Sequence, residues 1–154
     1  MTNHINDGEN LYGRVLARIR MDFKGIGKPG KLFFGGKDTE KVAEEIRDQQ
    51  VAVFRNVPIQ GISIEDIEMN TEVYTMYDEI NHIEVAFAPV SMVISADTLQ
   101  DILRFVAREE FRKIEILEPA SIHLSKHDIE RLFFRMSEEM KATRQYMERK
   151  YNGR

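Results

Sequence analysis

The chain has 154 residues and no cysteine, which excludes disulfide bonds, thiolate catalysis and cysteine-based metal sites within this sequence. Its hydrophobic fraction of 42% and its charged fraction of 31% are typical of a folded globular protein. A net charge of −4 indicates no nucleic-acid or membrane partner by itself, and no apolar run approaches the roughly 20 residues that a membrane helix needs.

The charges are segregated along the chain. The first 37 residues carry seven basic side chains against three acidic ones. No Lys or Arg lies between Arg55 and Arg104, where nine acidic residues are found. This distribution predicts a basic N-terminal part and an acidic middle part, each able to contribute to binding.

Residues 1–10 are polar and predict a loose N-terminal segment, without the basic and apolar regions of a signal peptide. Residues 11–154 are predicted to form a single α+β domain in the cytoplasm. Within residues 11–23 the apolar side chains alternate with a second set that includes two arginines, and this period of two predicts a strand. The apolar set is Val15, Ala17, Ile19 and Met21, and the other set is Leu16, Arg18, Arg20 and Asp22.

The next part of the chain is predicted to alternate between loops, helices and strands. A glycine-rich loop over 25–30 is followed by an extended run over 31–34. Asp38 is predicted to cap a helix that reaches about Gln49. Val51 to Val57 is predicted to be a strand closed by Pro58, and a short capped helix is predicted after Ser63.

The second half begins with predicted strands around 72–77 and 82–88, and a further strand over 91–95 follows Pro89. Asp97 is predicted to cap a helix with an apolar stripe at helical spacing, which consists of Leu99, Ile102, Leu103 and Val106. Extended segments are predicted over 113–117 and 121–124. A long helix is predicted from Ser125 to about Tyr151.

These elements predict an α+β fold with a largely antiparallel sheet, two covering helices and a long C-terminal helix. The pattern S-x-x-D-I-E occurs twice, at Ser63–Glu68 and at Ser125–Glu130. One interpretation is an internal duplication with pseudo-repeats over 31–69 and 90–131. The alternative is that S-x-x-D is a capping sequence common at helix starts.

Three short motifs resemble nucleotide-binding, phosphate-binding or metal-binding sequences, but none predicts a cofactor or a metal site. Gly25 to Gly30 matches G-x-G-x-x-G, but an extended segment follows where a nucleotide-binding motif needs a helix. The G-G-K-D-T run at 35–39 lacks the preceding glycine of a phosphate loop and has an aspartate in its Ser/Thr position. His123 and His127 are four residues apart, but the helix is predicted to begin between them.

Two surfaces are predicted to make contacts with partners. The first consists of basic residues on the N-terminal strand and its adjoining loop: Arg14, Arg18, Arg20, Lys24, Lys28 and Lys31. The second consists of the apolar residues Met140, Met147 and Tyr151 in the long helix, which are predicted to contact a second copy of the chain. The alternative is a frayed helix end whose methionines lie singly on the surface. The first half of that helix, including Ile129 and Phe133, is predicted to be covered by the domain's own core.

The sequence favours a non-catalytic regulatory or adaptor protein that acts through protein–protein contacts, with a homodimer expected. The alternative is an RNA- or DNA-binding module that uses the basic strand and loop. A small-molecule enzyme is the third possibility, although no nucleophile–base pair or nucleophile elbow is present in the sequence. A contiguous basic face would favour nucleic acid, and scattered basic residues would favour the adaptor.

Overall fold

The computed structural model describes residues 14–27 and 38–152 of the chain. Among these residues every strand pairing is antiparallel. The predicted α+β fold is confirmed, with a largely antiparallel sheet and a long C-terminal helix. The elements in chain order are β1 (Val15–Ile26), α1 (Thr39–Asn56), β2 (Ile62–Glu68), β3 (Tyr74–Asp78), β4 (Ile83–Ala96), α2 (Leu99–Val106), β5 (Phe111–Glu118) and α3 (Lys126–Asn152).

Strand β4 is the centre of the sheet, in which the path of neighbours is β2-β4-β1-β5. Strand β1 pairs with β4 from one end to the other, and β5 lies beyond β1. On the opposite edge of β4, β3 pairs with its first residues and β2 with its last. The predicted strands at 82–88 and 91–95 are therefore one continuous strand.

Pro89 lies inside this central strand because its missing N–H falls in a gap between two partners. Its neighbour on β1 is Asp22, whose own N–H is directed to β5 and bonds the carbonyl of Glu110 at 2.9 Å. On the other edge of β4, β3 pairing ends at Phe87 and β2 pairing begins at Ser91. A proline in this gap removes no ladder hydrogen bond.

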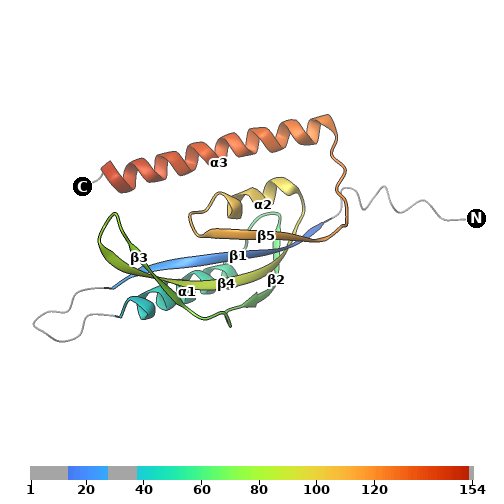
Figure 1. The fold of residues 1–154 in the computed structure, drawn as a ribbon. Helices are drawn as coiled ribbons and strands as arrows, with labels where there is room; N and C mark the ends of the chain where they lie inside the picture. The colour runs from blue at the N-terminus through green and yellow to red at the C-terminus, as the bar shows by residue number, and fades with distance from the viewer. Residues whose placement is uncertain (1–13, 28–37, 153–154) are drawn as a thin grey trace, which may run out of the picture.

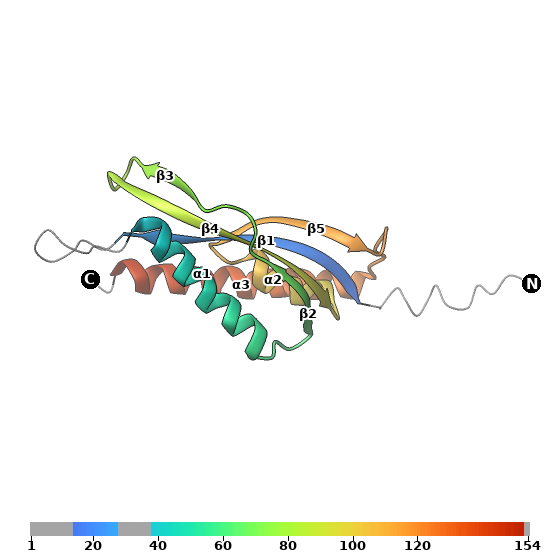
Figure 2. The ribbon, with the colours of Figure 1, turned by 90° about the horizontal axis from the view of Figure 1, so that it is seen from below.

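One face of the sheet carries the hydrophobic core. The alternation in β1 places Ala17, Ile19, Met21 and Phe23 on this face, fully buried, as the sequence predicts. Helix α1 adds Val51 and Phe54, and α2 adds Ile102 and Phe105. In Figure 2, α1 and α2 lie on the same side of β1 and β5. We call the sheet with α1 and α2 the body.

Helix α1 approaches the sheet most closely where Gly25 of β1 meets Ala43. A Cβ added at Gly25 would lie 2.6 Å from the Cα of Ala43, which is closer than carbon atoms pack. Glycine at this position therefore allows the backbone of α1 to contact the strand. The helix begins after Asp38, whose carboxylate accepts from the N–H of Glu40, and this N-cap was predicted.

The predicted strand over 51–57 is wrong, because α1 continues to Asn56. Val51 and Phe54 follow Ala43 and Ile46 at spacings of three to five residues and extend the same buried face. The β-branched residues of this run suggested a strand, but packing on the sheet decides in favour of the helix. Pro58 does mark its end, since the residue before a proline disfavours helical geometry.

The predicted short helix after Ser63 is also wrong, because these residues form strand β2. Its isoleucines, Ile62, Ile64 and Ile67, pack against the core from the edge of the sheet, with a register shift between Ile64 and Asp66. At Ser125 the same S-x-x-D pattern does cap a helix, since Ser125 and Asp128 exchange hydrogen bonds of 3.0 and 3.1 Å. The two copies of the pattern therefore differ in structure.

The remaining expectations differ mainly in their limits. Helix α2 is capped by Thr98 rather than Asp97, through a capping box with Asp101. Strand β5 confirms the extended segment over 113–117, whereas 121–124 forms no strand. The extended run predicted over 31–34 lies outside the described residues. Helix α3 confirms the long C-terminal helix, and in Figure 1 it lies at the top with α2 between it and the strands.

Candidate functional site

The basic residues predicted on the first strand lie at or along β1, on the face opposite the core. Arg18 and Arg20 alternate with buried residues, as predicted. Each of three arginines makes an ion pair within the chain, which reduces the positive charge that this face offers. The pairs are Arg14 with Asp97 at 3.4 Å, Arg18 with Glu115 at 2.9 Å and Arg20 with Asp22 at 3.0 Å.

Asp22 is the buried member of this face, with a side chain that is 2% exposed. One carboxylate oxygen accepts from Nε of Arg20 at 3.0 Å, and the other accepts from the hydroxyl of Tyr74 at 2.6 Å. Nε of Arg112 lies 3.7 Å from the second oxygen. A buried carboxylate is stable only when its oxygens are bonded in this way.

An aromatic pair covers the cluster. The ring of Tyr74 stacks on Phe87 at 5.2 Å between centroids, and the guanidinium of Arg112 lies 5.3 Å from the Phe87 ring centroid. Burial, together with the hydrogen bond to Asp22, raises the pKa of Tyr74 above its ordinary value. The hydrogen bond to Asp22 raises the pKa of Arg20, which keeps the guanidinium charged. The cluster ties together β1, β3, β4 and β5.

Sequence reasoning missed Tyr74, Phe87 and Arg112 as members of this cluster, because they come from three other strands. The available signal was Asp22 itself, an acidic residue two positions from Arg20 on a strand whose other charges are basic. Arg20 and Arg112 both lie against Asp22, so the cluster has a structural role on this face. No acid–base pair is arranged here for catalysis among the described residues.

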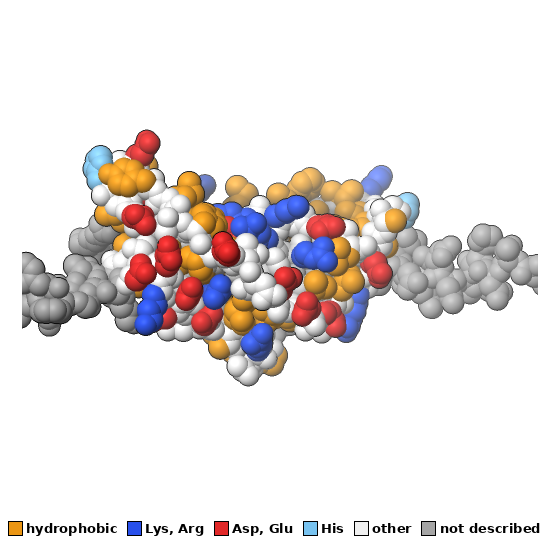
Figure 3. All heavy atoms as spheres, turned by 60° about the horizontal axis from the view of Figure 1, so that its bottom comes forward, with side chains coloured by type: hydrophobic (Ala, Val, Ile, Leu, Met, Phe, Trp, Pro, Cys, Tyr) orange, Lys and Arg blue, Asp and Glu red, His pale blue; other side chains and the backbone are white. Residues whose placement is uncertain are grey.

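The other predicted basic residues complete the description of this surface. Lys24 is exposed on β1, and Lys28 and Lys31 lie outside the described residues. On the face drawn in Figure 3, acidic and basic side chains are intermixed. Binding of a partner by these basic residues stays a prediction.

Helix α3 differs from the other helices because none of its residues, 126–152, is buried. The three predicted dimer contacts lie on its surface: Met140 is 64% exposed, Tyr151 57% and Met147 37%. The main neighbour of α3 in the body is α2. The structure thus places these three residues on one element, while their contact with a second copy stays a prediction.

The expectation that the core covers the first half of α3 is wrong. Phe133 is 63% exposed and Ile129 and Met136 are also exposed, while Leu132 is half-buried. The physical reason is that α1 and α2 already cover the apolar face of the sheet, and α3 packs mainly on α2. Phe134, which sequence reasoning did not single out, is also largely exposed.

The second half of α3 is separated from the body by a hollow that an ion pair spans. A hollow of about 630 Å³ lies between it and the end of α2, lined by Arg104, Arg108, Tyr146 and Met147 among others. Nζ of Lys150 lies 3.6 Å from a carboxylate oxygen of Glu109 across this space. Because both side chains are well exposed, such a pair contributes little to stability.

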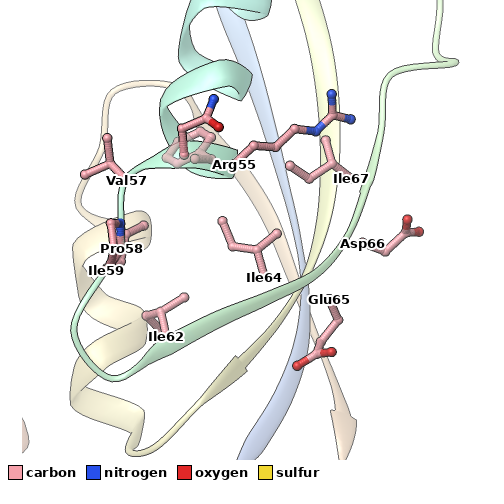
Figure 4. A pocket seen from close by; sticks show the side chains of 11 residues that line it. Arg55, Val57, Pro58, Ile59, Ile62, Ile64, Glu65, Asp66 and Ile67 are labelled. Carbon is pink, nitrogen blue, oxygen red and sulfur yellow. The ribbon is translucent and has the colours of Figure 1, made fainter.

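A separate hollow of about 470 Å³ lies between the end of α1 and the edge strand β2. Figure 4 shows Ile62 and Ile64 directed toward it, whereas the carboxylates of Glu65 and Asp66 are directed away. The hollow is therefore lined by apolar side chains together with polar ones, among them Arg55 and Asn56. None of the basic or apolar residues predicted as contacts lines it.

Comparisons with known proteins give no relative: no protein-family model, no curated protein and no solved structure matches this chain. Within the described residues no three side chains of His, Asp or Glu gather as a metal site would require. Among the same residues, no helix is sufficiently long and apolar to span a bilayer.

Proposed function

We propose that this chain is a non-catalytic regulatory or adaptor protein that acts through protein–protein contacts made by α3. One observation supports the proposal: a 27-residue helix without a buried residue carries large apolar side chains on its surface. These residues are Ile129, Phe133, Phe134, Met136, Met140, Tyr146, Met147 and Tyr151.

Exposed apolar side chains that gather on one element are costly to leave in water and mark interaction sites in folded proteins. Aromatic residues and methionine are also the residue types enriched at the centre of protein interfaces. The basic face of β1 gives weaker support for binding, because three of its arginines are already paired within the chain. Protein contact through α3 is therefore the function that we favour.

Site-specific photo-crosslinking tests this proposal. A photoreactive phenylalanine analogue replaces Met140 on the apolar side, and in a matched variant it replaces Glu138 on the exposed polar side of the same helix. We expect irradiation in cells that express the protein to join the Met140 variant to another polypeptide, and the Glu138 variant to give much less product. The absence of any polypeptide adduct at Met140 and at Phe133 would refute the proposal.

A further inference from the structure

The exposed apolar residues of α3 follow a heptad repeat. Six positions are separated by steps of four, three, four, three and four residues, the spacing at which two long helices pack along each other. Five of them are apolar and one is threonine; we call these six residues the α3 seam. They are Ile129, Phe133, Met136, Met140, Thr143 and Met147.

The fold leaves the seam accessible to a second helix. Leu132, Glu139 and Tyr146 line hollows between α3 and the body. They are seven residues apart and lie beside the seam, about 100° around the helix from the seam residue that follows each of them and about 40–60° from the nearest one. Thr143 and Met147 of the seam also line the hollow toward the end of α2, and both are exposed to solvent. A helix that packs on the seam therefore approaches beside the body rather than through it.

A shallow hollow already lies along the centre of the seam. It has a volume of about 320 Å³ and is lined by Phe133, Met136 and Met140, with Lys141 and Arg144 at its side. Apolar side chains of a second helix would fill this hollow and remove its phenylalanine and methionine surface from water.

The seam is complementary to itself when two copies run antiparallel. A half-turn about residue 138 places each seam residue opposite another seam residue. The opposed pairs are Ile129 with Met147, Phe133 with Thr143 and Met136 with Met140. The largest side chain is thus opposed to the smallest, and the two central methionines, which adapt well, meet each other.

The charges beside the seam favour the same orientation. Glu130 and Arg144 occupy equivalent heptad positions on the side of the seam away from the body, and both are exposed. In the antiparallel arrangement Glu130 of one copy lies near Arg144 of the other, and the symmetry gives this pair twice. In a parallel arrangement the same two positions of the two copies lie on opposite sides of the interface, so this pair does not form.

From this spacing and charge pattern we propose that α3 pairs antiparallel with α3 of a second copy of this chain through the seam. The inference rests on the proposed function and names the partner. The result is a symmetric dimer with one body on each helix, closed by the two-fold axis that passes near residue 138.

The association state of the full chain is the first test. Analytical ultracentrifugation at tens of micromolar should give a dimer. Phe133→Asp and Met140→Asp should each weaken association at least about 100-fold, because the symmetry buries two unpaired carboxylates. Both positions are largely exposed within one copy, so circular dichroism should show an unchanged fold. A full-length chain that stays monomeric would overturn the inference.

Charge exchange tests the orientation. Glu130→Arg and Arg144→Glu alone should each weaken the dimer about fivefold, since each places like charges together at two sites. The double variant should restore association to within about twofold of the original. Glu138→Arg, on the exposed side away from the seam, is the matched control and should have no effect. A dimer that the double exchange fails to restore would overturn the antiparallel arrangement.

The two proposals fail in different ways. If the chain is monomeric but the Met140 crosslink captures a different polypeptide, the self-pairing inference is overturned while contact through α3 stands. If the chain is monomeric and no adduct forms, both are overturned.

Discussion

The sequence marks two surfaces for binding, the basic outer face of β1 and the apolar residues in the second half of α3, and the fold leaves them in different environments. On β1, Arg18 and Arg20 form ion pairs within the chain, and Asp22 is buried among Arg20, Tyr74 and Arg112. On α3 none of the residues is buried, because α1 and α2 already cover the apolar face of the sheet and α3 packs mainly on α2. A charged or apolar pattern in the sequence therefore indicates a binding surface only when the fold leaves its side chains exposed and unpaired.

The largest expected difference in stability is between a phenylalanine-to-alanine change in the core and the same change on α3. Phe105 of α2 is 2% exposed and packs near Phe54, so Phe105→Ala should reduce the free energy of unfolding by about 3–5 kcal/mol. Phe133→Ala on α3 should reduce it by less than about 0.5 kcal/mol. Urea unfolding at submicromolar protein, where association is minimal, measures both. Equal losses would show that α3 belongs to the core.

A second effect concerns the close contact of α1 with β1. Gly25→Ala should destabilise the protein by about 3 kcal/mol, because the new Cβ would press on the backbone of Ala43. Ala43→Gly in the same chain should not rescue the loss, since the nearest atoms belong to the backbone. Rescue in thermal unfolding would show that the side chain of Ala43 alone makes this contact.

The Asp22 cluster gives the next effect. Asp22→Ala should cost about 2–3 kcal/mol, because it removes a buried acceptor from two arginines and a tyrosine while the arginines keep partial access to water. The matched control is Glu115→Ala, which removes an exposed partner of Arg18 and should change stability by about 0.5 kcal/mol or less. Chemical denaturation of both variants tests whether burial sets the difference.

The smallest effect is a pH dependence at Tyr74. Tyr74→Phe should cost about 1 kcal/mol at neutral pH through loss of the hydrogen bond to Asp22. Folding raises the pKa of Tyr74, so its contribution is fully present below the pKa of the unfolded chain and is lost as pH rises through the higher folded value. The advantage of the original over Tyr74→Phe should therefore shrink above about pH 10. An advantage that is constant to pH 11.5 would contradict this assignment.

Features governed by neighbours in sequence were predictable. The alternation in β1 gave the buried face, and Asp38 and Ser125 marked two helix starts through hydrogen bonds to residues within three positions. The spacing of apolar residues also predicted the long α3. Such signals act over two to four residues and survive in almost any tertiary context.

Features governed by distant neighbours were not predictable. The sequence of residues 51–56 predicts a strand, but these residues pack on the sheet as a helix. Ser63 predicts a helix cap, but Ile62 and Ile64 pair with β4 at the edge of the sheet. The Asp22 cluster depends on four strands meeting, and its members Asp22 and Arg112 are 90 residues apart. Local propensities are weak, and burial of apolar surface overrides them.

The sequence by itself determined where the apolar and charged side chains lie along each helix and strand, because that follows from periods of 2 and 3.6 residues. Only the tertiary structure decided which of those side chains are buried or paired, because burial depends on what the rest of the chain places against each surface. Arg18 and Arg20 of β1 meet acidic partners, whereas α1 and α2 cover the apolar face of the sheet and α3 has no buried residue. The seam of α3 is therefore exposed to solvent in a single copy of the chain.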